Sequence, residues 1–337
     1  MKTHTPLVSI LIPAHNAQRW ISSTVQSALA QTWPSKEIII VDDGSSDETL
    51  TIARSLESRD VAVVSQQKQG ASAARNTAYS IAQGDYIQWL DADDLLDPHK
   101  ISHQMAVAIR CNSQRTLFSG AWGAFIYRVC KARFVPTALW CDLSPIEWLL
   151  RKLGQNLWMQ TATWLTSRTL TDVAGRWDTR MLSDDDGEYF SRVILASDGI
   201  RFVPDARMYY RRGFPSLSYI GDCRRQLEAL LLSLRLNIDY IRSLEDSQRV
   251  RAACREYLRT SLIYFYPEHP DLVDGVKELA AAIREPMQPP HLSWKYCWIQ
   301  KLCGWHASKR AQMHYNQAKL FFLRSWDKTM FSLSSAR

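Results

Sequence analysis

The chain has 337 residues, of which 46% are hydrophobic and 22% are charged, and these fractions are typical of a soluble globular protein. No apolar run approaches the roughly 20 residues that a membrane-spanning helix needs, and seven scattered cysteines without a CxxC pair argue against a disulfide framework. Residues 1–6 show no signal-peptide pattern, so we expect a cytoplasmic protein.

The net charge of +7 is concentrated at one end of the chain. Residues 286–337 carry eight Lys or Arg against a single acid, Asp327, so this segment accounts for the whole excess and residues 1–285 are balanced. The basic character therefore belongs to the tail. No nucleic-acid-binding motif accompanies it, and we expect no nucleic-acid partner.

The first third of the chain alternates between apolar, β-branched runs and segments with helical periodicity. We predict strands at 7–12, 37–41, 61–65 and 86–90, and helices at 20–31, 48–56 and 71–82. Pro13 is expected to end the first strand. Strand–helix alternation at this spacing predicts a mostly parallel sheet with helices on both faces.

Polar clusters follow three of these strands, where ligands bind in open sheets of this kind. Asn16 follows the first strand, Asp42-Asp43 the second, and Asp91, Asp93 and Asp94 the fourth. Carboxylates this close repel one another, and Mg²⁺ or Mn²⁺ takes such oxygen ligands. The alternative is an acidic N-cap for a helix at 95–110.

Two further segments have an equally simple structural alternative. A carboxylate at Asp42-Asp43 can accept hydrogen bonds from a nucleobase or a ribose, or it can form an Asx turn before a helix. Arg75, near the start of the third helix, suits a diphosphate, or it is a solvated helix arginine.

Taken in order, residues 8–16, 41–47, 70–76 and 84–94 resemble the successive blocks of family 2 glycosyltransferases of the GT-A fold, and the resemblance covers about residues 7–215. It implies an inverting, metal-dependent transferase of hexosyl type that uses a nucleotide-diphosphate sugar, with UDP as the default nucleotide. On this resemblance the metal, Mn²⁺ or Mg²⁺, is held by Asp91 and Asp93, with Asp94 as the alternative ligand. The donor-side residues are then Pro13, Asn16, Asp42, Asp43, Arg75, Asp91 and Arg211.

Residues 182–192 resemble the acidic motif of the same family. The alignment puts Asp186 in the position of the catalytic base, with Glu188 and Arg192 matching downstream and Asp185 where the family has Glu. An acceptor hydroxyl needs such a base to become a good nucleophile. The alternative is a capped start for a helix at 189–195.

The middle of the chain is less informative. We predict strands at 119–129 and 158–164, a helix at 148–153 and a turn at 175–178. The tryptophans of this region either line an acceptor pocket or fill the core, and they are Trp122, Trp140, Trp148, Trp158, Trp164 and Trp177.

Two closing strands are predicted at 200–204 and 208–212. Arg211-Arg212 at their end either reach the donor diphosphate or pair with Asp185 or Glu188. Ser216 and Ser218 follow in a loop that we expect to close over the donor.

The last third predicts helices at 222–244, 247–264 and 271–283, then a break at Pro286, Pro289 and Pro290. We divide the chain into a GT-A domain at 1–218 and a helical extension with a basic aromatic tail at 219–337. The tail either lies peripherally on the inner face of the membrane or packs back on the enzyme with a basic outer face.

The expected function is transfer of a sugar to a glycan or lipid-linked acceptor, in polysaccharide, lipid-linked glycan or other cell-surface glycan synthesis. One alternative is a catalytically inactive sugar-nucleotide-binding protein. Another is a nucleotidyltransferase, but residues 12–16 lack the glycine-rich loop of that class. His15 in this segment is expected to be a hydrogen-bonded loop residue.

Overall fold

The computed structural model of the chain describes residues 5–212, 223–286, 295 and 297–335. Its first sheet has the order β3-β2-β1-β4-β8, in which only the edge strand β8 is antiparallel. The strands are β1 (Val8–Ala14), β2 (Lys36–Asp43), β3 (Val61–Gln66), β4 (Tyr86–Trp89) and β8 (Thr166–Ser167). The four predicted strands are confirmed. The prediction that Pro13 ends β1 was wrong, because Pro13 still pairs with Val41 and its fixed φ fits an extended chain.

Alternation along β1 divides the apolar side chains between two hydrophobic cores. Ile10 and Ile12 pack on one face with α1 (Ile21–Leu29) and α4 (Lys100–Cys111), while Leu11 packs on the other face with α3 (Ala71–Ile81). Helix α2 (Thr49–Ser55) lies beside α1. Helices therefore cover both faces of the sheet, as predicted.

A second sheet has the order β5-β9-β6-β7 and was not expected as a separate unit. Its strands are β5 (Leu95–Leu96), β6 (Thr116–Phe125), β7 (Arg133–Phe134) and β9 (Gly199–Arg211). The alternative of a helix at 95–110 was wrong at its start, because Leu95-Leu96 pair with Met208 and Tyr209 and the helix begins at Lys100. The two predicted closing strands are one strand, β9, with a register shift opposite Gly120/Ala121.

The strand predicted at 158–164 was wrong. The segment holds a 3₁₀ turn, η2 (Thr161–Thr163), in which Gln160 O accepts hydrogen bonds from both Thr163 N and Thr163 Oγ1. These local bonds satisfy the backbone without a strand partner. Trp148, Trp164 and Trp177 are buried, in agreement with a core role, whereas 56% of Trp158 is exposed.

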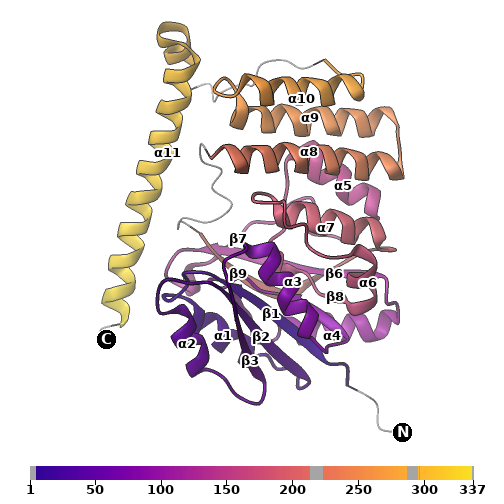
Figure 1. Cartoon of the computed structure of the whole chain (residues 1–337), viewed down its shortest axis with the longest axis vertical. Helices are drawn as coiled ribbons and strands as arrows, with labels where there is room; N and C mark the ends of the chain where they lie inside the picture. The colour runs from indigo at the N-terminus through magenta and orange to yellow at the C-terminus, as the bar shows by residue number, and fades with distance from the viewer. Residues whose placement is uncertain (1–4, 213–222, 287–294, 296, 336–337) are drawn as a thin grey trace.

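Three further helices are α5 (Pro145–Gln155), α6 (Arg168–Ala174) and α7 (Asp185–Ala196), and α7 contacts both α6 and α8. A short 3₁₀ turn, η1 (Val129–Lys131), precedes β7. Over α5 and α7 lie α8 (Arg224–Leu244), α9 (Gln248–Phe265) and α10 (Pro270–Ala282), as Figure 1 shows.

The predicted apolar stripe of α8 is buried, and one hydrophobic core runs from α3 through α7 into α8, α9 and α10. The division at 218/219 stays a prediction, and Ser216 and Ser218 lie outside the described residues.

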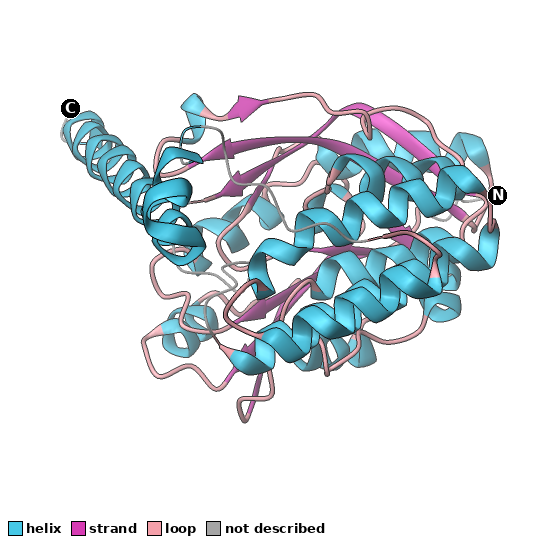
Figure 2. Ribbon diagram, turned by 90° about the horizontal axis from the view of Figure 1, so that it is seen from above, coloured by secondary structure: helices cyan, strands magenta, loops and turns pink. Residues whose placement is uncertain are grey.

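The long helix α11 (Cys297–Ser335) runs alongside the rest of the molecule, from the level of α10 to the level of α1 and α2 (Figures 1 and 2). It is kinked at Gly304, whose φ of 79° is in the left-handed region that glycine tolerates. Within the described part of the chain, no helix has the length and apolar character to cross a bilayer.

Candidate active site

The candidate site begins at the carboxyl ends of β1 and β2, where two loops hold each other. Asn16, with a left-handed φ of 51°, accepts a hydrogen bond from Ser46 N at 2.9 Å, and Asn16 N donates to Ser45 Oγ at 3.0 Å. His15 Nδ1 lies 2.9 Å from Asp43 O, which is the loop role expected for this histidine. Pro13, one residue before the end of β1, is half-buried in the floor of this corner.

Asp42 and Asp43 end β2 and are both buried, but their oxygens are used differently. Asp43 accepts from Gln66 Nε2 at 2.7 Å and from the backbone N–H of Gln69 and Gly70, both at 2.8 Å. Asp42 Oδ2 accepts from Ser45 N at 3.2 Å, whereas Asp42 Oδ1 is buried without a partner. Asp43 thus orders the turn before α3, whereas Asp42 has one buried acceptor oxygen that no protein group uses.

Arg75 joins the sheet edge to the acidic segment. Its guanidinium donates to Asp91 Oδ1 at 2.9 Å and to Asp185 Oδ2 at 2.5 Å, and it lies 4.3 Å from the centre of the Trp177 ring. Burial lowers the pKa of Arg75, but Asp185 and Asp91 raise it above its usual value, so the side chain is a fixed cation. The alternative of a solvated helix arginine was therefore wrong, because only 6% of the side chain is exposed.

Asp93 and Asp94 lie on the other side of Asp91. Burial, followed by the charge of Asp91, raises the pKa of Asp93 to about 6. Burial also raises the pKa of Asp94, with the charges of Asp93 and Asp91 adding to it. Asp94 Oδ1 accepts from Arg211 N at 2.7 Å, and Asp94 Oδ2 is buried without a partner. The positive charges nearby therefore do not fully balance the negative charges of these carboxylates.

Arg211 supplies part of that compensation. Its Nε donates to Asp93 O at 2.8 Å, and its guanidinium lies 4.0 Å from the Trp20 ring centre and 4.4 Å from that of Phe125. The predicted pairing of Arg211 with Asp185 or Glu188 was wrong, because β9 ends beside the loop after β4 instead.

The residues present fit a divalent metal that shares its ligands with a substrate. No three acidic, histidine or cysteine side chains converge on one point among the residues described. Mg²⁺ commonly binds one or two carboxylates and completes its shell with water and substrate phosphate. Asp91, with a third of its side chain exposed, and Asp93 can supply oxygen ligands, and Asp94, tied to β9 through Oδ1 but without a partner at Oδ2, stays the alternative. Asp91 and Asp93 stay the predicted metal ligands.

Asp186 lies in the first turn of α7, next to Asp185. Burial, and then the charges of Asp185 and Asp184, raise the pKa of Asp186 to about 7. The charge of Arg75 lowers this pKa and that of Asp91 raises it, so Asp186 belongs to the same cluster of interacting charges. A carboxylate with a pKa near neutrality is suited to accept a proton.

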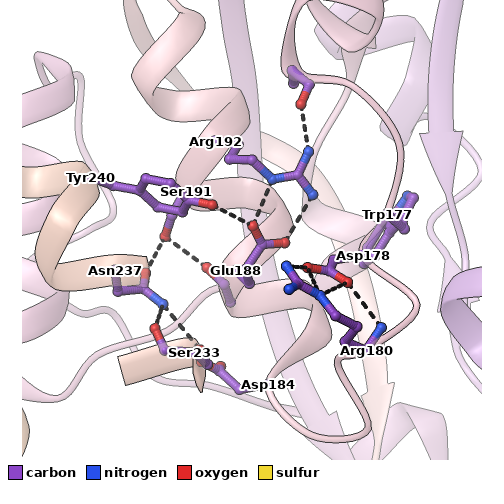
Figure 3. Close-up of polar contacts among 12 residues, drawn as sticks. Trp177, Asp178, Arg180, Asp184, Glu188, Ser191, Arg192, Ser233, Asn237 and Tyr240 are labelled. Atoms are coloured by element: carbon purple, nitrogen blue, oxygen red, sulfur yellow. Dashed lines mark hydrogen bonds and ion pairs between the residues drawn. The ribbon is translucent and has the colours of Figure 1, made fainter. Parts of the chain in front are cut away.

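The sequence predicted helix α8 but not that its polar side chains hold this acidic turn in place. Ser233 Oγ of α8 donates to Asp184 Oδ2 at 2.5 Å, Ser191 Oγ donates to Asn237 Oδ1 at 2.6 Å, and Tyr240 Oη donates to Glu188 Oε1 at 2.7 Å. Figure 3 shows these side chains of α7 and α8 pointing toward one another. The signal in the sequence was Ser233 and Asn237, four residues apart within the apolar stripe of α8.

Two basic side chains, Lys152 and Arg192, also bind groups of this turn. Lys152 Nζ of α5 donates to Gly187 O at 2.7 Å, and burial lowers the pKa of Lys152 while Asp184, Asp186 and Glu188 oppose that shift. Arg192 binds Glu188 through Nε at 2.6 Å and Nη2 at 2.9 Å. Glu188 and Arg192 therefore form a structural ion pair.

Comparison with known proteins covers the part of the chain that carries Asn16, Asp42, Asp43, Arg75 and the acids after β4. Residues 9–115 match the model of glycosyl transferase family 2. The UDP-Glc:alpha-D-GlcNAc-diphosphoundecaprenol beta-1,3-glucosyltransferase WfaP of Escherichia coli is 46% identical over 100 residues, which are 29% of this chain and 40% of that protein. In the first relatives that match, from Rickettsia species and E. coli, the aligned segment is 20–40% of the relative's own length.

Solved structures extend the likeness to most of the chain. Residues 1–349 of TarS from S. aureus superpose with a TM-score of 0.59 and 18% identity, covering 82% of each chain. The mannosyltransferase PcManGT from Pyrobaculum calidifontis, solved with GDP-Man and Mn²⁺, gives a TM-score of 0.55 and 16% identity over 97% of this chain and 89% of that one. The fold is therefore the GT-A type expected from the sequence, with a helical C-terminal part.

Proposed function

We propose that this chain transfers a sugar from a nucleotide-diphosphate donor to an acceptor hydroxyl, with inversion at the anomeric carbon. The match of residues 9–115 to the model of glycosyl transferase family 2 supports this proposal. The observation that carries the proposal is the buried ion cluster of Arg75, Asp91 and Asp185. It links the end of β4, where the metal ligands are predicted, to the start of α7, where the base is predicted.

The donor is proposed to bind across the ends of β1, β2 and α3. Asp42 Oδ1 is the buried acceptor without a partner, and it suits a ring N–H or a ribose hydroxyl. The first turn of α3, after Gly70 with its φ of 96°, offers backbone N–H groups to an anionic phosphate. Pro13 and Asn16 border this region. UDP is the proposed nucleotide.

A divalent metal, Mn²⁺ or Mg²⁺, would be held by Asp91 and Asp93 and would neutralise charge on the leaving diphosphate. Arg75 holds Asp91 and Asp185 at a fixed separation, so donor-side and acceptor-side groups keep their relative positions. Arg211, through Asp93 O and Asp94 Oδ1, fixes the loop after β4 on β9. These contacts supply the preorganisation that transferase chemistry needs.

Asp186 is proposed to take the proton of the acceptor hydroxyl. The acceptor oxygen then forms its bond to the anomeric carbon on the face opposite the diphosphate, and the bond from that carbon to the phosphate oxygen breaks with its electron pair leaving on the diphosphate. A base in this role contributes roughly 10²–10⁴ in rate.

The acceptor is proposed to be a lipid-linked glycan. The E. coli relative, which is similar to this chain over 100 residues, is named for an acceptor sugar on diphosphoundecaprenol. The alternative of an inactive sugar-nucleotide-binding protein has no observation in its favour, since the candidate base and both candidate metal ligands are present.

The test is a donor screen on the full chain. UDP-, GDP- and dTDP-sugars are titrated with Mn²⁺, with Mg²⁺ and with EDTA, following binding by calorimetry and donor hydrolysis by release of nucleoside diphosphate. Asp93→Asn is expected to abolish metal-dependent donor binding, while Asp186→Asn keeps binding and loses at least 10²-fold in turnover.

Asp60→Asn, in the exposed turn just before β3 and so at the edge of the sheet opposite the site, is the matched control and is expected to behave as the wild type. Absence of binding to every nucleotide-sugar with metal present would refute the proposed function. Turnover retained in Asp186→Asn would refute the assignment of the base alone.

A further inference from the structure

Helix α11 is attached to the body at its two ends. Near its start, the Trp305 ring packs edge-on against Tyr266 with centroids 5.1 Å apart, and Lys309 Nζ bonds Glu268 at 2.6 Å. Near its end, Asp327 pairs with Arg128 at 2.6 Å. Asp327 is the only acid of α11, so its charge is already used in holding the helix to the body.

The side of α11 turned away from Asp327 is apolar. Tyr315, Phe322, Trp326 and Leu333 follow one another at spacings of seven, four and seven residues, which keeps them on one side of a helix. Their exposed fractions are 58%, 70%, 67% and 60%. Four large apolar side chains on one exposed strip mark an interaction surface.

The same helix is basic. It carries six cations, Lys301, Lys309, Arg310, Lys319, Arg324 and Lys328, against the single acid Asp327. Arg310, Lys319 and Lys328 are exposed. A second copy of the chain is a poor partner for this surface, because pairing two such helices brings like charges together. An anionic lipid surface accepts the aromatic strip and Lys319, which borders it at three and four residues from Phe322 and Tyr315, and it attracts the net positive charge of the helix.

The docking point of α11 lies close to the candidate active site. Phe331 packs against Tyr127 at 6.1 Å between centroids, and Tyr127 packs against Trp20 at 5.8 Å. Trp20 in turn lies under the guanidinium of Arg211, which binds the loop of Asp93 and Asp94. A helix α11 bound to a membrane would thus be connected to the site through Phe331, Tyr127 and Trp20.

We propose that the strip Tyr315, Phe322, Trp326 and Leu333, with Lys319 at its edge, binds an anionic phospholipid surface and holds the catalytic domain there. This inference rests on the proposed function only in that a lipid-linked acceptor gives the attachment a purpose. The helix lies on the surface rather than crossing it, in keeping with its mixed apolar and charged sides.

The experiment is flotation of the full chain with vesicles of phosphatidylglycerol and phosphatidylcholine, compared with vesicles of phosphatidylcholine alone. The wild type is expected to float with the anionic vesicles, and less so as salt is raised. Lys319→Gln is expected to weaken the partition about fivefold, since a basic residue near such a surface is worth about 1 kcal/mol. Phe322→Ser/Trp326→Ser is expected to weaken it by a similar factor.

Matched controls are Trp158→Ser and Arg59→Gln, exposed residues of the same kinds outside α11, which should float as the wild type does. Donor hydrolysis is measured on every variant. Equal flotation with neutral vesicles, wild-type flotation of both α11 variants, or sedimentation as a dimer that only the α11 variants abolish would overturn the inference. Loss of flotation with donor hydrolysis intact in those variants supports it, and failure of donor hydrolysis in the wild type would count against the proposed function alone.

Discussion

Gly187 tests whether the acidic turn is held as described. It is the third residue of α7 and its φ is not in the left-handed region, so alanine suits the backbone and would normally stabilise a helix by about 1 kcal/mol. A Cβ at this position, however, would lie 2.6 Å from Asp184 Cγ. The carboxylate of Asp184 must then move, and it is bonded to Ser233.

The cost follows from that bond. A hydrogen bond to a charged group contributes about 1.5–3 kcal/mol, so losing it outweighs the gain in helix propensity and leaves Gly187→Ala about 0.5–2 kcal/mol less stable. Gly154→Ala in α5 is the matched control, because its Cβ meets Ala253 at an ordinary 3.5 Å, and we expect it to be neutral or up to about 1 kcal/mol more stable. Displacing the first turn of α7 also moves Asp186, for which a loss of about 10²-fold in transfer is expected.

Urea unfolding and transfer rates of both variants give the answer, together with a double-mutant cycle. If the cost acts through Asp184 and Ser233, Gly187→Ala costs less in a Ser233→Ala background than in the wild type. Stabilisation of Gly187→Ala to the same degree as Gly154→Ala, or strict additivity in the cycle, would refute the reasoning.

Two other predictions concern the acids of α7. Since the pKa of Asp186 is raised to about 7 from about 3.9 in an unfolded chain, transfer should rise with pH through about 7 in the wild type. The ionised form costs stability above pH 7 but not below pH 4, so Asp186→Asn should be more stable than the wild type at pH 8 and equal at pH 4, measured by urea unfolding; equal stability at both pH values would contradict the shift. Tyr240→Phe removes one hydrogen bond to Glu188, whose ion pair with Arg192 remains, so a loss of about 1–2 kcal/mol in stability is expected, against no change for the exposed Tyr264→Phe. A loss of transfer rate greater than this loss of stability accounts for would show that α8 also positions the acidic turn.

Local sequence patterns were sufficient for the parallel strands of the first sheet. The β-branched runs at β1 to β4 and the intervening helical periodicity predicted the parallel sheet, because both signals depend only on near neighbours in the chain. Parallel strands bring their carboxyl ends to one edge, so Asn16, Asp42 and Asp91 could be expected to meet there.

The same patterns failed where long-range pairing decided the outcome. Leu95-Leu96 read as the start of a helix, yet they form a strand because Met208 and Tyr209 of β9, more than a hundred residues away, pair with them. Residues 158–164 had the composition of a strand, but local bonds to Gln160 O satisfied their backbone first.

The sequence by itself determined which residue types can do chemistry at the edge of the sheet, since carboxylates at strand ends and an acidic helix start are local features. Only the tertiary structure decided their partners. Arg75 is bound to Asp91 and Asp185, and Ser233 to Asp184, through contacts spanning up to 110 residues of chain. Such contacts depend on how helices and sheets pack, and periodicity along one segment carries no information about what packs against it.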